Sequence, residues 1–180
     1  MSEVIQSGSV AVADTVMKFR RIITGHNQAG EAIFIEDEVC AHRHAIKNIP
    51  TFATTELWKT AATPVDNTEQ SPVDLVAGRF ALNPPACGSV FRIVEFVPDR
   101  LWKSDADEPD MMHRTPSLDY AYVIKGQIHA LLDNQETLMK AGDVLIQRGT
   151  NHAWANRSDE PCIVLFVLID GKEMAHLPAH

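Results

Sequence analysis

Short apolar segments alternate with turn residues along the chain, most regularly between residues 111 and 170. Apolar runs cut at even intervals by glycine, asparagine and aspartate are typical of antiparallel strands joined by tight turns. The turn positions are Lys125-Gly126, Asp133-Asn134, Ala141-Gly142-Asp143, Arg148-Gly149 and Ser158-Asp159. The pattern predicts consecutive strands in a sheet that closes on itself.

Segments before this region also predict strands. Residues 18–35 predict a hairpin because two apolar runs flank a loop that contains Gly30. Residues 54–59 and 89–97 predict single strands, the second from its alternation of faces. Residues 36–50 mix charge with few apolar side chains and predict a connecting loop. Because no helical apolar period is sustained, we expect an all-β fold whose sheet edges are hidden by closure.

Composition excludes two classes of protein. The 180 residues include 45% hydrophobic and 22% charged side chains, which suits one soluble domain with a full core. No apolar run approaches the ~20 residues of a membrane-spanning helix. The formal charge is −8 and basic residues cluster only in pairs such as Arg20-Arg21, so a nucleic-acid partner is not expected. We expect residues 1–17 to be a tail and residues 18–180 to form a single domain.

Cysteine usage indicates the compartment. Cys40, Cys87 and Cys162 are odd in number and unrelated in spacing, and the N-terminus lacks the pattern of a secretory signal. We therefore expect a cytoplasmic protein. One face of a strand would bring Cys40 together with His42 and His44. No further ligands lie near them, so a surface loop is the preferred interpretation over a metal clip.

The region between residues 107 and 126 resembles the first motif of the cupin family. That motif is a Gly, five residues, His-x-His, three or four residues, Glu, six residues and Gly. His113, Asp119 and Gly126 keep its spacing, with Asp119 in place of the Glu. Asp107 stands where the first Gly belongs, and Thr115 replaces the second His.

The second cupin motif is Gly, five residues, Pro-x-Gly, two residues, His, three residues and Asn. Gly142 opens the equivalent segment, and His152 is followed after three residues by Asn156. Between them Gln147-Arg148-Gly149 stands for the Pro-x-Gly turn, with one residue fewer.

The resemblance implies a fold and an assembly. The fold is all-β, a cupin-type double-stranded β-helix (jelly-roll barrel) with an N-terminal β extension. Residues 110–170 would be its core, and residues 18–97 the extension and first barrel strands. Residues 162–169 are apolar on both faces, and cupins commonly pair through such sheet surfaces, so the resemblance implies a homodimer.

The alternation of side chains between the two faces of each predicted strand places several candidate site residues on the same face. His113, Thr115 and Asp119 share one face, and His152 and Trp154 share one face of a later strand. Two imidazoles and a carboxylate suit a divalent metal such as Fe, Mn, Ni or Zn. The resemblance implies His113, Asp119 and His152 as metal ligands and catalytic residues. The alternative is a metal-free pocket in which Asp119 fixes the ring tautomer of a histidine.

The neighbouring residues predict a pocket for a small molecule. Trp154 would form a flat wall for a ring-containing ligand, with Met111 and Tyr122 opposite and Thr115 beside the histidines. Arg148 could bind a ligand carboxylate. The alternatives are an ordinary core position for Tyr122 and a solvated turn for Arg148.

Three functions remain open at this point. The first is a metal-dependent enzyme, a dioxygenase, decarboxylase or isomerase, acting on a small organic acid or aromatic metabolite. The second is a metal-free protein that binds a small molecule for sensing or delivery. The third is metal-free acid–base catalysis by the two histidines and Asp119. His152→Ala is expected to abolish activity under either enzymatic function.

Overall fold

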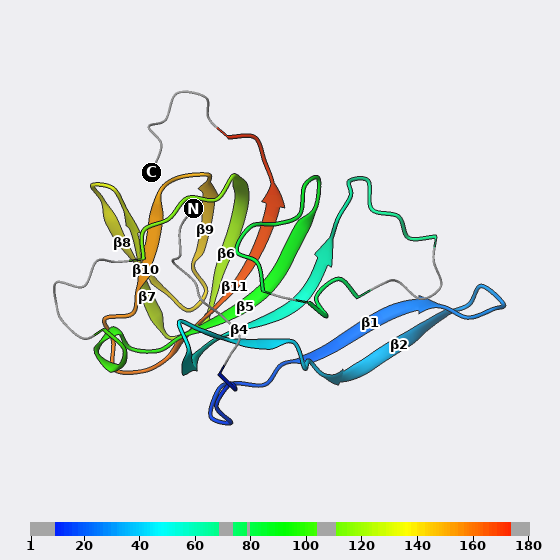
Figure 1. Cartoon of the computed structure of the whole chain (residues 1–180), viewed down its shortest axis with the longest axis horizontal. Coiled ribbons are helices and arrows are strands. Elements are labelled where there is room, and N and C mark those ends of the chain that lie inside the picture. Colours follow the sequence, from blue (N-terminus) through cyan, green and yellow to red (C-terminus); the bar gives the residue numbers. More distant parts are fainter. Residues whose placement is uncertain (1–9, 69–73, 79, 104–110, 174–180) are drawn as a thin grey trace.

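The computed structural model describes residues 10–68, 74–78, 80–103 and 111–173 (Figure 1). Residues 1–9 of the expected tail and Asp107 of the first motif lie outside these ranges. The described strands are β1 (Arg20–His26), β2 (Ala32–Val39), β3 (Arg43–Ile46), β4 (Ile49–Thr60), β5 (Ser89–Phe96), β6 (Ser117–Lys125), β7 (Gln127–Leu132), β8 (Glu136–Lys140), β9 (Val144–Arg148), β10 (His152–Ala155) and β11 (Cys162–Asp170), with a 3-10 turn η1 (Asp99–Leu101) after β5.

The strands form two sheets and a separate hairpin. One sheet has six strands in the order β3-β4-β5-β11-β6-β9, and the other has three in the order β10-β7-β8. The strands β1 and β2 pair with each other as a two-stranded ribbon that projects from the body (Figure 1). An isolated bridge between His113 and His152 connects the segment before β6 to β10. This arrangement confirms the predicted all-β, double-stranded β-helix fold.

Glycine turns set the order of the strands. Gly126 joins β6 to β7 with φ of 79°, and Gly142 lies between β8 and β9 with φ of 96°. Side chains disfavour this left-handed region, so glycine is the suitable residue at both turns. A Cβ at Gly126 would also lie 2.8 Å from the carbonyl oxygen of Pro161.

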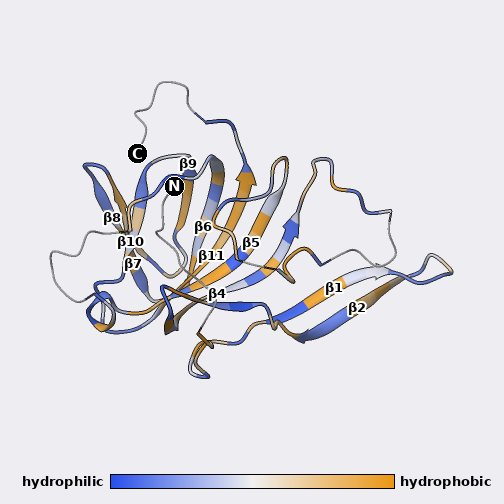
Figure 2. Cartoon of the chain, viewed as in Figure 1, coloured by the Kyte–Doolittle hydropathy of each residue, from blue (hydrophilic) through white to orange (hydrophobic). Residues whose placement is uncertain are grey.

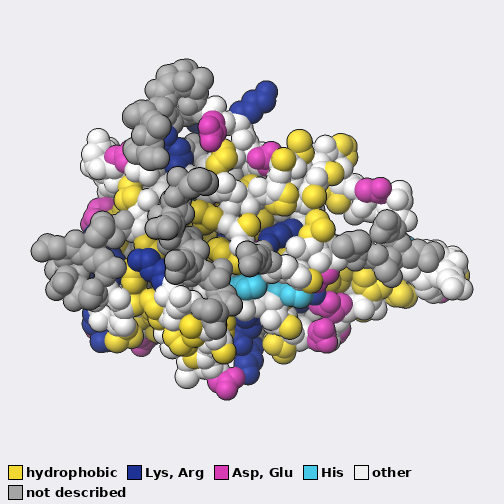
Figure 3. All heavy atoms as spheres, in the orientation of Figure 1, with side chains coloured by type: hydrophobic (Ala, Val, Ile, Leu, Met, Phe, Trp, Pro, Cys, Tyr) yellow, Lys and Arg dark blue, Asp and Glu magenta, His cyan; other side chains and the backbone are white. Residues whose placement is uncertain are grey.

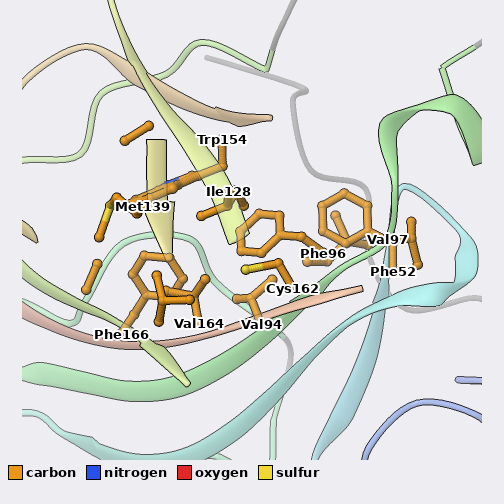
Figure 4. Packing of buried hydrophobic residues seen from close by; sticks show 14 of the residues in the cluster. Phe52, Val94, Phe96, Val97, Ile128, Met139, Trp154, Cys162, Val164 and Phe166 are labelled. Atoms are coloured by element: carbon orange, nitrogen blue, oxygen red, sulfur yellow. The ribbon is translucent and has the colours of Figure 1, made fainter. Parts of the chain in front are cut away.

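The core lies between the two sheets and is built from inward-facing side chains of both. Trp154 of β10 packs against Phe166 of β11 with ring centroids 5.3 Å apart, and against Phe96 of β5 at 6.2 Å (Figure 4). Offset and edge contacts between aromatic rings at these distances are stabilising. Trp154 therefore ties the three-stranded sheet to the six-stranded one.

The prediction of a loop at residues 36–50 is wrong, because much of this segment is strand. It contains the end of β2 and all of β3. The charged residues of the ribbon are paired across it, Arg20 with Asp37 and Arg21 with Glu36. Cross-strand ion pairs let a polar segment remain extended. No helix in the described part of the chain is long and apolar enough to cross a membrane.

Candidate functional site

A cavity of about 80 Å³ opens between the two sheets. Aromatic and aliphatic side chains form most of its lining, including Phe52, Phe96 and Trp154. The polar side chains that line it are Arg92, His113, Thr115, Asp119 and His152. An apolar cavity with a few convergent polar groups is the usual form of a small-molecule site.

The alternation of side chains along β6 directs the carboxylate of Asp119 into this cavity. Ser117, Asp119 and Ala121 are the buried positions of the first part of β6, and the residues between them are more exposed. The backbone of Asp119 is paired with Gln147 of β9, whose side chain is also buried. The two side chains therefore meet on the same face of the sheet.

A chain of hydrogen bonds runs through these side chains. Ser117 Oγ donates to Asp119 Oδ1 over 2.6 Å, and Gln147 Nε2 donates to Asp119 Oδ2 over 2.8 Å. The same amide nitrogen lies 3.0 Å from Nε2 of His152. An amide NH₂ carries two hydrogens, so Gln147 can donate to the carboxylate and to the imidazole together.

The two imidazoles are oriented by backbone carbonyls. Nδ1 of His113 is 2.8 Å from the carbonyl oxygen of Met111, and Nδ1 of His152 is 3.0 Å from that of Thr150. A carbonyl only accepts, so each Nδ1 carries the hydrogen and each neutral ring keeps its lone pair on Nε2. The rings lie close together, with centroids 4.2 Å apart and planes 53° apart.

Burial controls the charge of these groups. It lowers the pKa of His152 to about 3, and the nearby His113 adds to this effect. Burial also lowers the pKa of His113, whereas the Met111 carbonyl and Asp119 oppose that change. The pKa of Asp119 is raised, again by burial first, against the hydrogen bonds from its two donors. Both imidazoles are therefore neutral at neutral pH.

The donor set does not fit a metal ion in this arrangement. Gln147 stands between Asp119 and His152 and hydrogen-bonds to both, so the carboxylate and the imidazole do not converge on one point. Thr115 Oγ1 lies 2.8 Å from Ser117 Oγ, with which it shares a hydrogen bond, and it does not supply the missing ligand. Among the residues that the structure describes, no group of three or more His, Cys, Asp and Glu is placed to hold a metal.

The structure brings some of the predicted ligand-binding residues together and leaves others apart. Met111, Thr115 and Trp154 line the cavity with the two histidines and the carboxylate. Tyr122 is 42% exposed on the outer face of β6, because it lies an odd number of residues from Asp119. Arg148 is exposed for the same reason, since it follows the inward-facing Gln147.

Two residues of the site were missed by the sequence analysis. Gln147 was assigned only to a turn, and its role depends on a strand pairing that no local pattern reveals. Arg92 of β5 lines the cavity and is 3% exposed, with Nε 3.0 Å from Glu56 Oε1. The alternation of residues 89–97 could have indicated its inward direction, since Val90, Val94 and Phe96 share its face.

Arg92 also holds one wall of the cavity. Its Nη2 donates to the carbonyl oxygen of Ala81 over 2.7 Å and its Nη1 to that of Leu82 over 3.4 Å. The guanidinium carbon lies 4.8 Å from the ring centroid of Phe80. Phe80 and Leu82 line the cavity from the long connection between β4 and β5. This part of the wall is thus fixed to the sheet through Arg92.

Comparison with known proteins agrees with this fold. The family model described as a cupin domain matches residues 100–168. The chain is 38% identical over 146 residues to phomopsin biosynthesis cluster protein C′ of Diaporthe leptostromiformis, spanning 77% of this chain and 70% of that protein. It is 35% identical over 159 residues to the cupin-domain-containing oxidoreductase virC of Hypocrea virens, spanning 84% and 76%.

One solved structure matches this chain at low sequence identity. A cupin 2 conserved barrel domain protein from Salinispora arenicola superposes with a TM-score of 0.40 and 15% identity, over 66% of this chain and 76% of that one. The family assignment rests on the curated relatives and the family model, which agree with the motifs at His113 and His152. By these similarities the chain belongs to the cupin family.

Proposed function

We propose that this protein is an enzyme of small-molecule biosynthesis that moves a proton between two carbon atoms of a carbonyl compound with an apolar body. The observation that carries the proposal is the state of His113. Its Nδ1 is fixed by the Met111 carbonyl, and no hydrogen bond to its Nε2 is formed within the described residues. A neutral imidazole with an available lone pair, facing an apolar cavity, is a suitable general base.

Three polar residues of the cavity have a part in such a reaction. Nε2 of His113 would take a proton from the carbon next to the carbonyl group, and the same imidazolium would return it to another carbon. The buried carboxylate of Asp119 stabilises the positive ring in between. The guanidinium of Arg92 places positive charge beside the negative charge that develops on the carbonyl oxygen. No proton, electron or oxidant is consumed overall.

The apolar lining supports the class of substrate. Phe52, Phe96 and Trp154 provide flat surfaces for a ring-containing molecule and keep water from the proton in transit. The relatives are named as a biosynthesis cluster protein and as an oxidoreductase. The proposed proton shift oxidises one carbon and reduces another carbon two bonds away, so it needs no external electron acceptor.

The experiment follows the isomerisation of cyclohex-3-en-1-one to its conjugated isomer by ultraviolet absorbance. It is combined with deuterium uptake from heavy water into a panel of cyclic ketones and aryl alkyl ketones, which carry exchangeable hydrogens next to the carbonyl group. We expect His113→Ala to reduce the rate by at least about 100-fold, the lower range for loss of a general base. We expect His152→Ala to abolish activity as well, because its loss removes one partner of the Gln147 amide. Absence of both conversion and deuterium uptake would contradict the proposal.

A metal-dependent oxidoreductase that binds its metal through the two histidines, without the Asp119 carboxylate, is the second candidate. Histidines that bind a metal typically donate a hydrogen bond from the other ring nitrogen, for example to a backbone carbonyl. Both His113 and His152 donate such a hydrogen bond from Nδ1. Metal content should be measured by plasma mass spectrometry on protein purified without chelator. Near-stoichiometric metal that disappears in both His113→Ala and His152→Ala would favour this candidate over proton transfer. Activity that survives chelator treatment in the metal-free protein would favour proton transfer.

A further inference from the structure

Thr115 lies at the edge of the polar network of the cavity. It lines the cavity, is 1% exposed, and follows His113 by two residues. Its Oγ1 lies 2.8 Å from Ser117 Oγ, which is itself 2.6 Å from Asp119 Oδ1. Thr115, Ser117 and Asp119 thus form a short chain of hydrogen bonds that starts at the cavity and ends at the carboxylate. What this chain offers to a ligand depends on which oxygen donates in each contact.

The hydrogens of this chain can be assigned from the groups that carry them. A carboxylate only accepts hydrogen bonds, and each hydroxyl group carries one hydrogen. Gln147 Nε2 donates to Asp119 Oδ2 and Ser117 Oγ donates to Asp119 Oδ1, so both carboxylate oxygens have a donor. The hydrogen of Ser117 is thereby used, and the contact between Ser117 and Thr115 can be made only with the hydrogen of Thr115. Thr115 therefore donates to Ser117 and has no hydrogen left for a ligand.

Thr115 offers the cavity an acceptor. A hydroxyl oxygen that donates one hydrogen bond keeps its lone pairs, and no donor within the described residues is bonded to Thr115 Oγ1. His113 Nε2 is also an acceptor, because the hydrogen of that ring is on Nδ1. The rest of the lining is largely apolar, and β11, which forms part of it, is hydrophobic along most of its length (Figure 2). Because a buried acceptor without a donor costs free energy, a ligand that brings a donor is favoured.

The charges around the cavity indicate which kind of donor fits. The guanidinium of Arg92 lines the same cavity, so an ammonium group would meet a like charge there. On the face shown in Figure 3, acidic side chains gather mainly where the β1–β2 ribbon projects, and the body of the protein offers a cation little attraction. A hydroxyl group donates a hydrogen bond without bringing a charge. It is therefore the donor that suits both Thr115 and Arg92.

We propose that Thr115 sets substrate specificity by accepting a hydrogen bond from a hydroxyl group on the carbon atom from which His113 removes the proton. The substrate class is then a cyclic ketone with a hydroxyl group next to the carbonyl group. The identity of the reacting carbon rests on the proposed function, whereas the hydrogen bond to Thr115 can be measured as binding without turnover. No covalent bond forms or breaks at Thr115.

The test compares 2-hydroxycyclohexanone with 2-methylcyclohexanone, in which a methyl group of similar size replaces the hydroxyl group. Dissociation constants are measured on the intact chain by ligand-observed NMR at up to about 20 mM, the range of affinity expected for ligands this small. The measured quantity is the ratio of the two constants. Thr115→Val keeps the shape of the side chain and removes the acceptor, so it should shift this ratio against the hydroxy ketone by at least about 10-fold.

Two further variants complete the comparison. Thr115→Ser keeps the hydroxyl group and should retain the ratio of the wild type. Thr137→Val changes an exposed threonine of β8 and is the matched control, which should also leave the ratio unchanged. Binding of 2-methylcyclohexanone by Thr115→Val shows that its cavity is intact, and Thr115→Ala takes its place if that variant does not fold.

Deuterium uptake from heavy water, followed in the same samples, separates this proposal from the proposed function. A shift of the ratio without deuterium uptake would support the hydroxyl site and contradict proton transfer. Deuterium uptake with an unchanged ratio in Thr115→Val would overturn the hydroxyl site alone. A Thr115→Ser ratio equal to that of Thr115→Val, or a wild type that binds neither ketone, would also overturn it.

Discussion

Asp119 of β6 and Gln147 of β9 are paired across the sheet, and the Gln147 amide joins the carboxylate to His152. Gln147 thus lies between the carboxylate and the imidazole and hydrogen-bonds to both. It also satisfies Asp119 Oδ2, one of two buried oxygens that cost free energy when they lack a donor. This relationship organises the polar part of the cavity, and it can be tested by removing the amide.

Gln147→Met keeps the length of the side chain and removes the donor. Leaving Asp119 Oδ2 without a partner should lower the free energy of unfolding by about 1–3 kcal/mol, the usual cost of an unsatisfied buried acceptor. Urea denaturation measures this change. Gln135→Met, at an exposed position in the turn after β7, is the control and should leave the free energy unchanged. Equal free energies of unfolding for the two variants would show that the hydrogen bonds of the Gln147 side-chain amide contribute nothing to stability.

Protonation of His152 should make the fold sensitive to acid. Its pKa is about 3 in the folded protein, against an ordinary value of 6.5. Between these values the unfolded chain binds a proton that the folded chain does not, so stability falls as the pH drops below 6.5. The expected slope is up to roughly 1.4 kcal/mol per pH unit. The raised pKa of Asp119 has the opposite effect on stability. As the pH falls, the folded state binds the Asp119 proton at a higher pH than the unfolded chain does, and this favours the folded state.

The measurement is urea denaturation at a series of pH values from neutral to acidic. His152→Gln should remove most of this slope, since it takes away the buried group that resists protonation. His26→Gln is the control, because it removes an exposed histidine at the end of β1. If the slope of the wild type persisted in His152→Gln, another buried group would have to account for it.

Arg92 should determine how well the cavity accepts a ring. The cavity of about 80 Å³ is roughly half the ~150 Å³ that admits benzene, so a ring-sized substrate requires part of the wall to adjust. Phe80 and Leu82 form the part that is held by Arg92 rather than by strand pairing. Arg92→Lys keeps the positive charge and loses the paired contacts to the two carbonyls.

Arg92→Lys is therefore expected to lower KM for cyclohex-3-en-1-one by about 10-fold, because the wall formed by Phe80 and Leu82 is held less firmly and can adjust to the ring. The effect on kcat should be smaller, since the positive charge near the reacting oxygen is retained. Arg92→Met should also destabilise the fold by about 3–5 kcal/mol, because it removes one partner of the buried Glu56. Lys59, whose Nζ lies 3.1 Å from that carboxylate, is retained in both variants. An equal fall in kcat for Arg92→Lys, with KM unchanged, would contradict a positioning role.

The sequence predicts the strands after residue 111 well because each is bounded by a turn signal. Gly126 and Gly142 mark two of these boundaries, and both adopt the left-handed backbone that their type favours. The gathering of His113, Asp119 and His152 at one cavity is also foreseen, since strand parity and the family motifs agree.

Other features depend on contacts between distant segments and could not be predicted in this way. The hydrogen bonds of Gln147 require the register between β6 and β9, and those of Arg92 require the course of residues 80–82. The extended structure of β2 depends on partners across the ribbon. The outward direction of Tyr122, by contrast, follows from simple alternation relative to Asp119 and could have been derived.

The last prediction concerns Asn156, the asparagine of the second motif, which is 1% exposed. Its Nδ2 donates to the carbonyl oxygens of Phe96 and Glu160, each over 2.8 Å. Its Oδ1 accepts from the backbone N–H and the hydroxyl of Ser158. The side chain thus closes the turn between β10 and β11 and fastens it to the end of β5, and it does not line the cavity.

Asn156→Ala should lower the free energy of unfolding by roughly 2–4 kcal/mol, because several buried groups lose their partners at once. Asn156→Asp should destabilise at least as much, since it loses both donors and places a buried carboxylate oxygen against the carbonyl oxygens of Phe96 and Glu160. Urea denaturation gives these values, with Asn67→Ala as an exposed control. Turnover per folded molecule should stay unchanged in both Asn156 variants. A fall in turnover without a loss of stability would instead place Asn156 in the catalytic machinery.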